Sequence, residues 1–301
     1  MRLITRADFD GLACGALLEH LGLINEWLFV HPKDIQDGLV DATKNDIAAN
    51  VPYIKGCALW FDHHSSEEER LGRDFKFEGA SRESPSCARL IYEYYGGEAK
   101  LGKFSEMVKY ADKVDSGNLT VDEIKRPEGW ILLGFIVDPR TGLGRFRNFT
   151  ISNFDLMKKL AKAALGKPVE EILNMPDVKQ RVEVYFEQNG MFIKMVKEHS
   201  KVSGNAVVTD LRGVKTIHAG NRFLVYTLFS EQNISVWVMD GKMNVNSVIT
   251  AGYSVINRTA TADIGSLMLK YGGGGHRKAG TCQTAYAETD RVLGEILSEI
   301  C

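Results

Sequence analysis

The stretch "ALWFDHHSSEE" (residues 58–68) places an acid and two adjacent histidines directly after a run of apolar residues. Such a short run of bulky side chains is typical of a buried strand, and we expect one at residues 57–61. Residues that follow a strand of an open α/β sheet line the crevice where ligands bind. Asp62, His63 and His64 therefore form either a metal or catalytic cluster or a solvated loop rich in imidazole.

The rest of the first half alternates short apolar runs with stretches of helical period. We expect strands at residues 2–5 and 26–31 and a helix at residues 11–22. A further helix is expected at residues 84–97, with Ser84 as its N-cap and a proline at its first position. Strands that alternate with helices in this way predict a parallel α/β sheet.

The second half begins helical and then changes to strands. Helices are expected at residues 152–166 and 178–199, and the second is long enough to be a spacer between two domains. We place the boundary so that residues 1–195 form one domain, including the linker helix at 178–195, and residues 196–301 form a smaller one. In the second domain we expect strands at 205–211, 223–229 and 234–240 and a last helix at 290–300.

Two aspartates follow the first expected strand. Asp8 and Asp10 are two residues apart, so both carboxylates can point to one side of an extended loop. Carboxylates suit Mg²⁺ and Mn²⁺, and nearby imidazole shifts the preference toward Mn²⁺. The alternative is a strand-to-helix turn in which Asp10 caps the helix. Asp112 and Asp115 end an amphipathic stretch, a pattern that is more often a solvated helix end.

The segment "YGGGGHRKAGTC" (residues 271–282) combines four glycines with basic side chains. A turn without side chains lets backbone N–H groups approach an anion, and His276, Arg277 and Lys278 would add charge and hydrogen bonds. This combination predicts a phosphate site, with Arg258 as a weaker candidate. The alternative is a flexible loop after a helix.

The composition excludes several classes of protein. The net charge of -2 over 301 residues makes binding to long nucleic acid unfavourable, because no overall basic field is present. Five scattered cysteines without a CxxC pair fit a reducing compartment. The apolar stretch at residues 130–137 is too short to span a bilayer. We expect a cytoplasmic protein without a membrane partner, and homodimerisation stays open.

Four motifs, in chain order, resemble those of the DHH phosphoesterase family with a C-terminal DHHA1 domain. That family includes RecJ-like exonucleases, oligoribonuclease-like enzymes and exopolyphosphatase-related proteins. The resemblance implies two α/β domains, a parallel-sheet DHH domain and a smaller DHHA1 domain, which face each other across a cleft and are joined by the long helix. The matching segments are DFDG (8–11), DHH (62–64), DSG (115–117) and GGGGHRKAG (272–280).

The resemblance also implies a metal-dependent phosphohydrolase whose substrate is a small nucleotide, a very short oligonucleotide or polyphosphate. One or two Mn²⁺ or Mg²⁺ ions would activate water and neutralise phosphoryl charge. Asp62 and His64 would be catalytic, with His64 on the substrate phosphate. The implied metal ligands are Asp8, Asp10, Asp62, His63 and Asp115, and the implied substrate-binding residues are Gly273, Gly274, Gly275, His276, Arg277 and Arg258.

The sequence departs from the family pattern at two places. Residues 4–7 lack the histidine that often precedes the first motif, and the second motif has Asn50 where an aspartate would bridge two metals, with Asp46 further back. Both changes weaken the same metal position, so one ion on Asp10, His63 and Asp115 is an alternative to two. A second reading of the function follows, a phosphate- or nucleotide-binding sensor with weakened hydrolysis.

Overall fold

The computed structural model describes residues 1–64, 67, 70–72, 74–241 and 245–301. The chain divides into two compact units, Met1–Asn118 with Pro127–Tyr185, and Leu119–Arg126 with Phe186–Cys301. The division falls inside the long helix α11 (Pro176–His199), which therefore joins the two units as expected. The predicted boundary at residue 195 lies further along the same helix.

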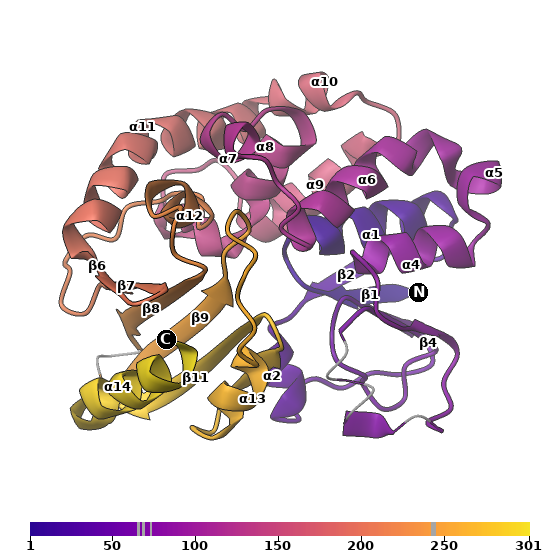
Figure 1. Ribbon diagram of the computed structural model, residues 1–301. Coiled ribbons are helices and arrows are strands. Elements are labelled where there is room, and N and C mark those ends of the chain that lie inside the picture. The colour runs from indigo at the N-terminus through magenta and orange to yellow at the C-terminus, as the bar shows by residue number, and fades with distance from the viewer. Residues whose placement is uncertain (65–66, 68–69, 73, 242–244) are drawn as a thin grey trace. The chain divides into compact units, whose positions relative to one another are not determined.

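The first unit is built on a five-stranded sheet in the order β2-β1-β3-β4-β5, and every neighbouring pair is parallel (Figure 1). This confirms the expected parallel α/β sheet. Because parallel strands end at one edge, the loops after β1, β3 and β4 start side by side. The strands are β1 (Arg2–Thr5), β2 (Glu26–Phe29), β3 (Asp46–Ala49), β4 (Leu59–Asp62) and β5 (Gly79–Ser81).

Helices cover this sheet. Leu3 and Ile4 of β1 are fully buried, as are all four residues of β3, because helices cover strands of parallel sheets on both faces. No described helix is both long and apolar enough to cross a membrane. The helices of this unit are α1 (Phe9–His20), α2 (Pro32–Gln36), α4 (Cys87–Tyr94), α5 (Gly97–Leu101), α6 (Ser105–Asp115), α8 (Gly129–Val137), α9 (Asn153–Ala164) and α10 (Val169–Leu173), with short 3₁₀ turns at Gly102–Phe104, Pro139–Thr141 and Leu143–Arg145.

Helix α4 begins later than predicted. Its N-cap is Ser86, whose side chain accepts a hydrogen bond from the backbone N–H of Arg89, so the expected cap at Ser84 is wrong. The carbonyl of Ser84 instead lies 3.0 Å from Nδ1 of His63. Ser84, before the proline, thus forms a hydrogen bond with His63, while Ser86, after the proline, caps the helix.

The second unit has a six-stranded mixed sheet in the order β10-β11-β9-β8-β7-β6, in which only β7 and β8 are parallel neighbours (Figure 1). Helices α13 and α14 pack their apolar side chains, among them Met268 and Ile296, against Val236 and Val238 of β8. The strands are β6 (Ser200–Ser203), β7 (Ala206–Asp210), β8 (Ile234–Asp240), β9 (Asn246–Tyr253), β10 (Gly274–His276) and β11 (Ala279–Ala285), and the helices are α7 (Val121–Lys125), α12 (Leu224–Leu228), α13 (Ile264–Leu269) and α14 (Thr289–Ile300), with a 3₁₀ turn at Tyr286–Glu288.

The strand predicted at residues 223–229 is wrong, since this segment forms α12. Asn221 accepts a hydrogen bond from the backbone N–H of Phe223 through its side chain, at 2.9 Å, and so starts a helical turn. The consecutive residues Leu224, Val225 and Tyr226 are all buried. A short run buried on every side has no period that separates a helix from a strand, so the preceding polar residue decides.

Candidate metal centre

Three predicted ligands come together at the carboxyl edge of the first sheet. Nε2 of His63 lies 3.7 Å from Oδ2 of Asp10 and 3.4 Å from Oδ2 of Asp115. One ligand atom from each residue lies within 4.8 Å of the other two, and no other such group of His, Cys, Asp and Glu occurs in the described chain. Two carboxylates and an imidazole at this spacing could hold a divalent cation.

The imidazole of His63 is oriented for coordination. Its Nδ1 lies 3.0 Å from the carbonyl oxygen of Ser84, which can only accept, so Nδ1 carries the proton in the neutral ring. The lone pair is then on Nε2, which is buried and makes no hydrogen bond with any residue the structure describes. A buried acceptor of this kind, between two carboxylates, fits a metal ion.

Asp10 is held in place by the start of α4. Its two oxygens accept hydrogen bonds from the backbone N–H groups of Cys87 and Ala88, at 2.9 and 2.8 Å. Burial, and next the charge of Asp115, raise the pKa of the Asp10 carboxyl to about 7, although His63 opposes the shift. A bound dication would favour the ionised form that burial disfavours.

The same charges act on His63. Burial alone would lower the pKa of this imidazole, but Asp115 and Asp10 outweigh that effect and the pKa is raised. Without a cation, the cluster is therefore a group of two acids and a base that compete for protons. Metal binding would release those protons.

Asp8 has a different role from Asp10. It is the N-cap of α1, since its Oδ1 accepts the backbone N–H of Gly11 at 3.0 Å, so the alternative in which Asp10 caps the helix is wrong. The same oxygen accepts Nδ2 of Asn50 at 3.0 Å, and Nε of Arg6 lies 3.3 Å from Oδ2. Asp8 thus lies among donors and outside the three-residue group.

Of the two residues considered for the second motif, only Asn50 lies at the functional edge of the sheet. It follows β3 directly, is buried, and has a left-handed backbone with φ of 58°, which asparagine tolerates better than most residues. Asp46 begins β3 at the opposite end and is bound by Arg2 at 2.6 Å and the backbone N–H of Thr43 at 2.7 Å. The structure therefore leaves Asp46 outside the site.

Asp62 orients the second histidine. It is fully buried at the end of β4, and its Oδ1 lies 2.7 Å from Nδ1 of His64. A carboxylate on Nδ1 holds the ring in one orientation. Asp62 is outside the group formed by Asp10, His63 and Asp115, although its Oδ2 makes no hydrogen bond with a described residue.

One functional candidate was missed from the sequence. Arg140 follows α8 and is close enough to Asp8 and Asp115 to interact with both charges. Asp138 binds the Arg140 Nε at 2.8 Å. Burial alone would lower the pKa of the Arg140 guanidinium. The negative charges of Asp138, and then of Asp8 and Asp115, outweigh that effect and raise the pKa. The sequence feature that could have indicated Arg140 is the oppositely charged pair Asp138 and Arg140, directly after the apolar helix α8.

In the second unit, the glycine run has a packing role that the sequence did not indicate. Gly274 and Gly275 belong to strand β10 and not to a turn. A Cβ on Gly275 would lie 2.2 Å from the carbonyl oxygen of Ala279, and one on Gly273 would lie 2.1 Å from that of Thr281. β10 is the edge strand of this sheet, and α13 packs closely against it, because a Cβ on Gly265 would lie 2.9 Å from the carbonyl oxygen of Gly275.

The basic residues beside this strand lie at the surface. Arg277 is exposed, and Arg258 donates from Nε to the carbonyl oxygen of Val255 at 3.0 Å. His276 is half-buried at the end of β10. His276 and Arg277 thus lie at one edge of the second sheet, whereas Arg258 lies in the segment that follows β9.

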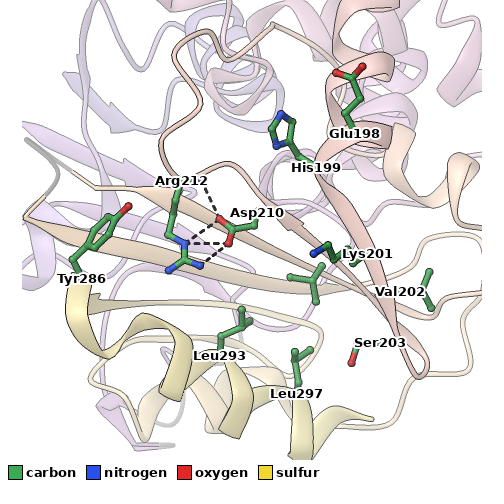
Figure 2. Close-up of a pocket in the computed structure, with 11 residues that line it drawn as sticks. Glu198, His199, Lys201, Val202, Ser203, Asp210, Arg212, Tyr286, Leu293 and Leu297 are labelled. Atoms are coloured by element: carbon green, nitrogen blue, oxygen red, sulfur yellow. Dashed lines mark hydrogen bonds and ion pairs between the residues drawn. The ribbon is translucent and has the colours of Figure 1, made fainter.

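A separate open depression of about 830 Å³ lies entirely in the second unit (Figure 2). The guanidinium of Arg212, which lines this depression, forms ion pairs with Asp210 and, at 2.7 Å, with Asp290. The positive charge of Arg212 is therefore offset. None of the predicted site residues lines it. The lining residues are Glu198, His199, Lys201, Val202, Ser203, Val208, Asp210, Arg212, Tyr286, Leu293 and Leu297.

Comparison with known proteins gives a full-length relative. No family model and no curated protein matches the chain. A solved structure of the pGpG-specific phosphodiesterase PggH from Vibrio cholerae is 43% identical, with a TM-score of 0.80 over 99% of this chain and 98% of that one.

Two distant structures share the fold. An exopolyphosphatase-related protein from Bacteroides fragilis is 14% identical, with a TM-score of 0.52 over 99% of this chain and 91% of that one. RecJ from Thermus thermophilus in complex with Mn²⁺ is 13% identical, with a TM-score of 0.53 over 99% of this chain and 51% of that one. This chain thus spans about half the length of RecJ.

Proposed function

Because the chain belongs to the DHH phosphoesterase family with a C-terminal DHHA1 domain, we propose that it hydrolyses the internucleotide phosphodiester bond of a linear dinucleotide such as pGpG. The observation that carries this proposal is the full-length identity of 43% with a pGpG-specific phosphodiesterase, together with the Asp10, His63 and Asp115 cluster. The chain is a metal-dependent phosphodiesterase, and the dinucleotide is the substrate we assign to it.

We assign the metal to Asp10, His63 and Asp115, with Mn²⁺ as the preferred ion. A mixed set of two carboxylates and one imidazole suits Mn²⁺ better than Mg²⁺, which favours oxygen ligands alone. When bound, such an ion supplies an activated water near neutral pH and offsets charge on the phosphoryl oxygens.

The remaining residues position the substrate. In its protonated form, His64 would donate from Nδ1 to Asp62, which lies at 2.7 Å, and from Nε2 to a non-bridging phosphate oxygen. Water then attacks phosphorus, the P–O3′ bond breaks, and the 3′-oxygen leaves with a proton, so that pGpG gives two GMP molecules. We also propose that His276 and Arg277 of the second unit bind a phosphate group, because their side chains carry the hydrogen-bond donors that suit one.

The experiment is an assay of purified protein with Mn²⁺ and a panel of phosphorylated substrates. We expect pGpG to be cleaved to GMP at least tenfold faster than a longer oligonucleotide or polyphosphate. The matched pair of variants is Asp115→Asn, which removes a ligand, and Asp122→Asn, an acid whose side chain is 78% exposed. Tight binding of pGpG without turnover by the wild-type protein would favour a sensor and contradict the proposal.

A further inference from the structure

We propose that the guanidinium of Arg6 is the second positive charge of this site, and that it binds the scissile phosphate beside a single divalent cation. This inference rests on the proposed phosphodiesterase function and adds to it the means by which the phosphate is held. It accounts for two features that the metal cluster leaves unexplained, the asparagine at position 50 and the set of donors around Asp8.

The position of Arg6 fits this role. It follows β1 at the carboxyl edge of the sheet, two residues before Asp8, and its side chain is 26% exposed. The Nε atom lies 3.3 Å from Oδ2 of Asp8, and this is the only ion pair or hydrogen bond that the Arg6 side chain makes with described residues. Its two Nη groups therefore remain available to an incoming anion.

The surroundings of Asp8 suit an arginine better than a metal. Three N–H donors, from Gly11, Asn50 and Arg6, lie within 3.3 Å of the Asp8 carboxylate. The amide of Asn50 presents its nitrogen to Asp8, since two oxygens facing each other would repel. A neutral amide in this orientation competes with a cation for the carboxylate instead of sharing one with it.

Charge balance supports a single ion. One dication offsets the carboxylates of Asp10 and Asp115, Arg6 pairs with Asp8, and the positive charge of Arg140 also acts on Asp8 and Asp115. A second dication at Asp8 would lie against a guanidinium and be repelled. A phosphodiester, in contrast, presents two non-bridging oxygens that match the two Nη groups of one guanidinium.

The first test measures metal content and kinetics together. We expect about one tightly bound Mn²⁺ per wild-type chain, with and without inorganic phosphate. Arg6→Gln should keep that count but lower kcat for pGpG by about 10²–10³-fold, the loss typical of a removed charge-stabilising donor. Arg6→Lys should recover part of the rate, since lysine restores the positive charge but not the planar pair of N–H donors of the guanidinium. Arg82→Gln, at an exposed ion pair with Glu93, is the matched control and should change nothing.

The second test converts the site. Arg6→His combined with Asn50→Asp replaces the guanidinium and the amide by ligands, and the Mn²⁺ count should rise from one to two. Two tight Mn²⁺ ions in the wild-type protein would overturn the inference, as would an unchanged kcat in Arg6→Gln. Metal counting needs no turnover, so it still decides the matter if the wild-type chain fails to cleave pGpG, a result that would refute only the proposed function.

Discussion

Nε2 of His63 lies 3.4 Å from Oδ2 of Asp115, although one residue follows a strand and the other is the last residue of a helix. The fold brings them together because α6 ends at the sheet edge where β4 also ends. Asp10 completes the group from the first turn of α1. Three separate parts of the chain thus supply one ligand each.

Removal of one ligand should abolish tight metal binding. For Asp115→Asn we expect the Mn²⁺ affinity, measured by calorimetric titration, to fall by about 10²-fold or more, because a neutral amide replaces a charged ligand. Asp115 is the suitable choice because its side chain is 24% exposed, so that the fold tolerates the change. Asp122→Asn should bind Mn²⁺ like the wild type. An unchanged affinity in Asp115→Asn would place the metal elsewhere.

Metal binding should stabilise the protein more at high pH. The Asp10 carboxyl has a pKa of about 7 in the metal-free fold, against an ordinary value of 3.8. A raised pKa adds stability that is fully present below the ordinary value and is lost as pH rises through about 7, at up to about 1.4 kcal/mol per pH unit.

A bound dication removes that loss by binding the ionised carboxylate. The rise in melting temperature on addition of Mn²⁺ should therefore be larger at about pH 8 than at about pH 6. Thermal scans with and without the metal measure it, with Mg²⁺ as a second ion. An equal or smaller rise at the higher pH would show that protons and the metal do not compete at this site.

The Asp62–His64 pair should affect rate and not metal content. In Asp62→Asn, Nδ1 of His64 loses its charged partner at 2.7 Å, so the ring loses its fixed orientation. We expect kcat to fall by about 10–100-fold while the Mn²⁺ count stays the same. A lower Mn²⁺ count in this variant would instead identify Asp62 as a metal ligand.

The glycine run should be needed for folding of the second unit. Gly275→Ala places a Cβ 2.2 Å from the carbonyl oxygen of Ala279 at a φ of 154°, and we expect it to lower the unfolding free energy by about 2 kcal/mol or more. Gly294→Ala, in an exposed part of α14 with open space around it, should raise stability by about 0.5–1 kcal/mol. Urea titrations compare the two. Equal stability of both variants would contradict the packing role.

The sequence predicted the sheet edge better than the details of the site. Asp10 and His63 follow strands that were clear from their apolar runs, and the carboxyl ends of parallel strands meet at one edge. Asp115 was expected only through its motif, because a helix end gives no local sign of what lies beside it.

Other details depend on contacts between distant residues. Asp8 caps α1 in place of Asp10, and this follows from the register of the helix start, which differs by two residues between the alternatives. Arg140 interacts with Asp8 and Asp115, which are distant from it in the sequence, and no local pattern records this proximity. Residues 223–229 were misassigned because a run buried on all sides lacks a period.

The central claim is tested most directly by the release of GMP from pGpG in the presence of Mn²⁺, compared between the wild-type chain and Asp115→Asn at equal protein concentration. We predict rapid cleavage by the wild type, no cleavage after chelation of the metal, and a loss of at least about 10²-fold in the variant. Equal rates for the two proteins, or no GMP from the wild type at any Mn²⁺ concentration, would contradict the account.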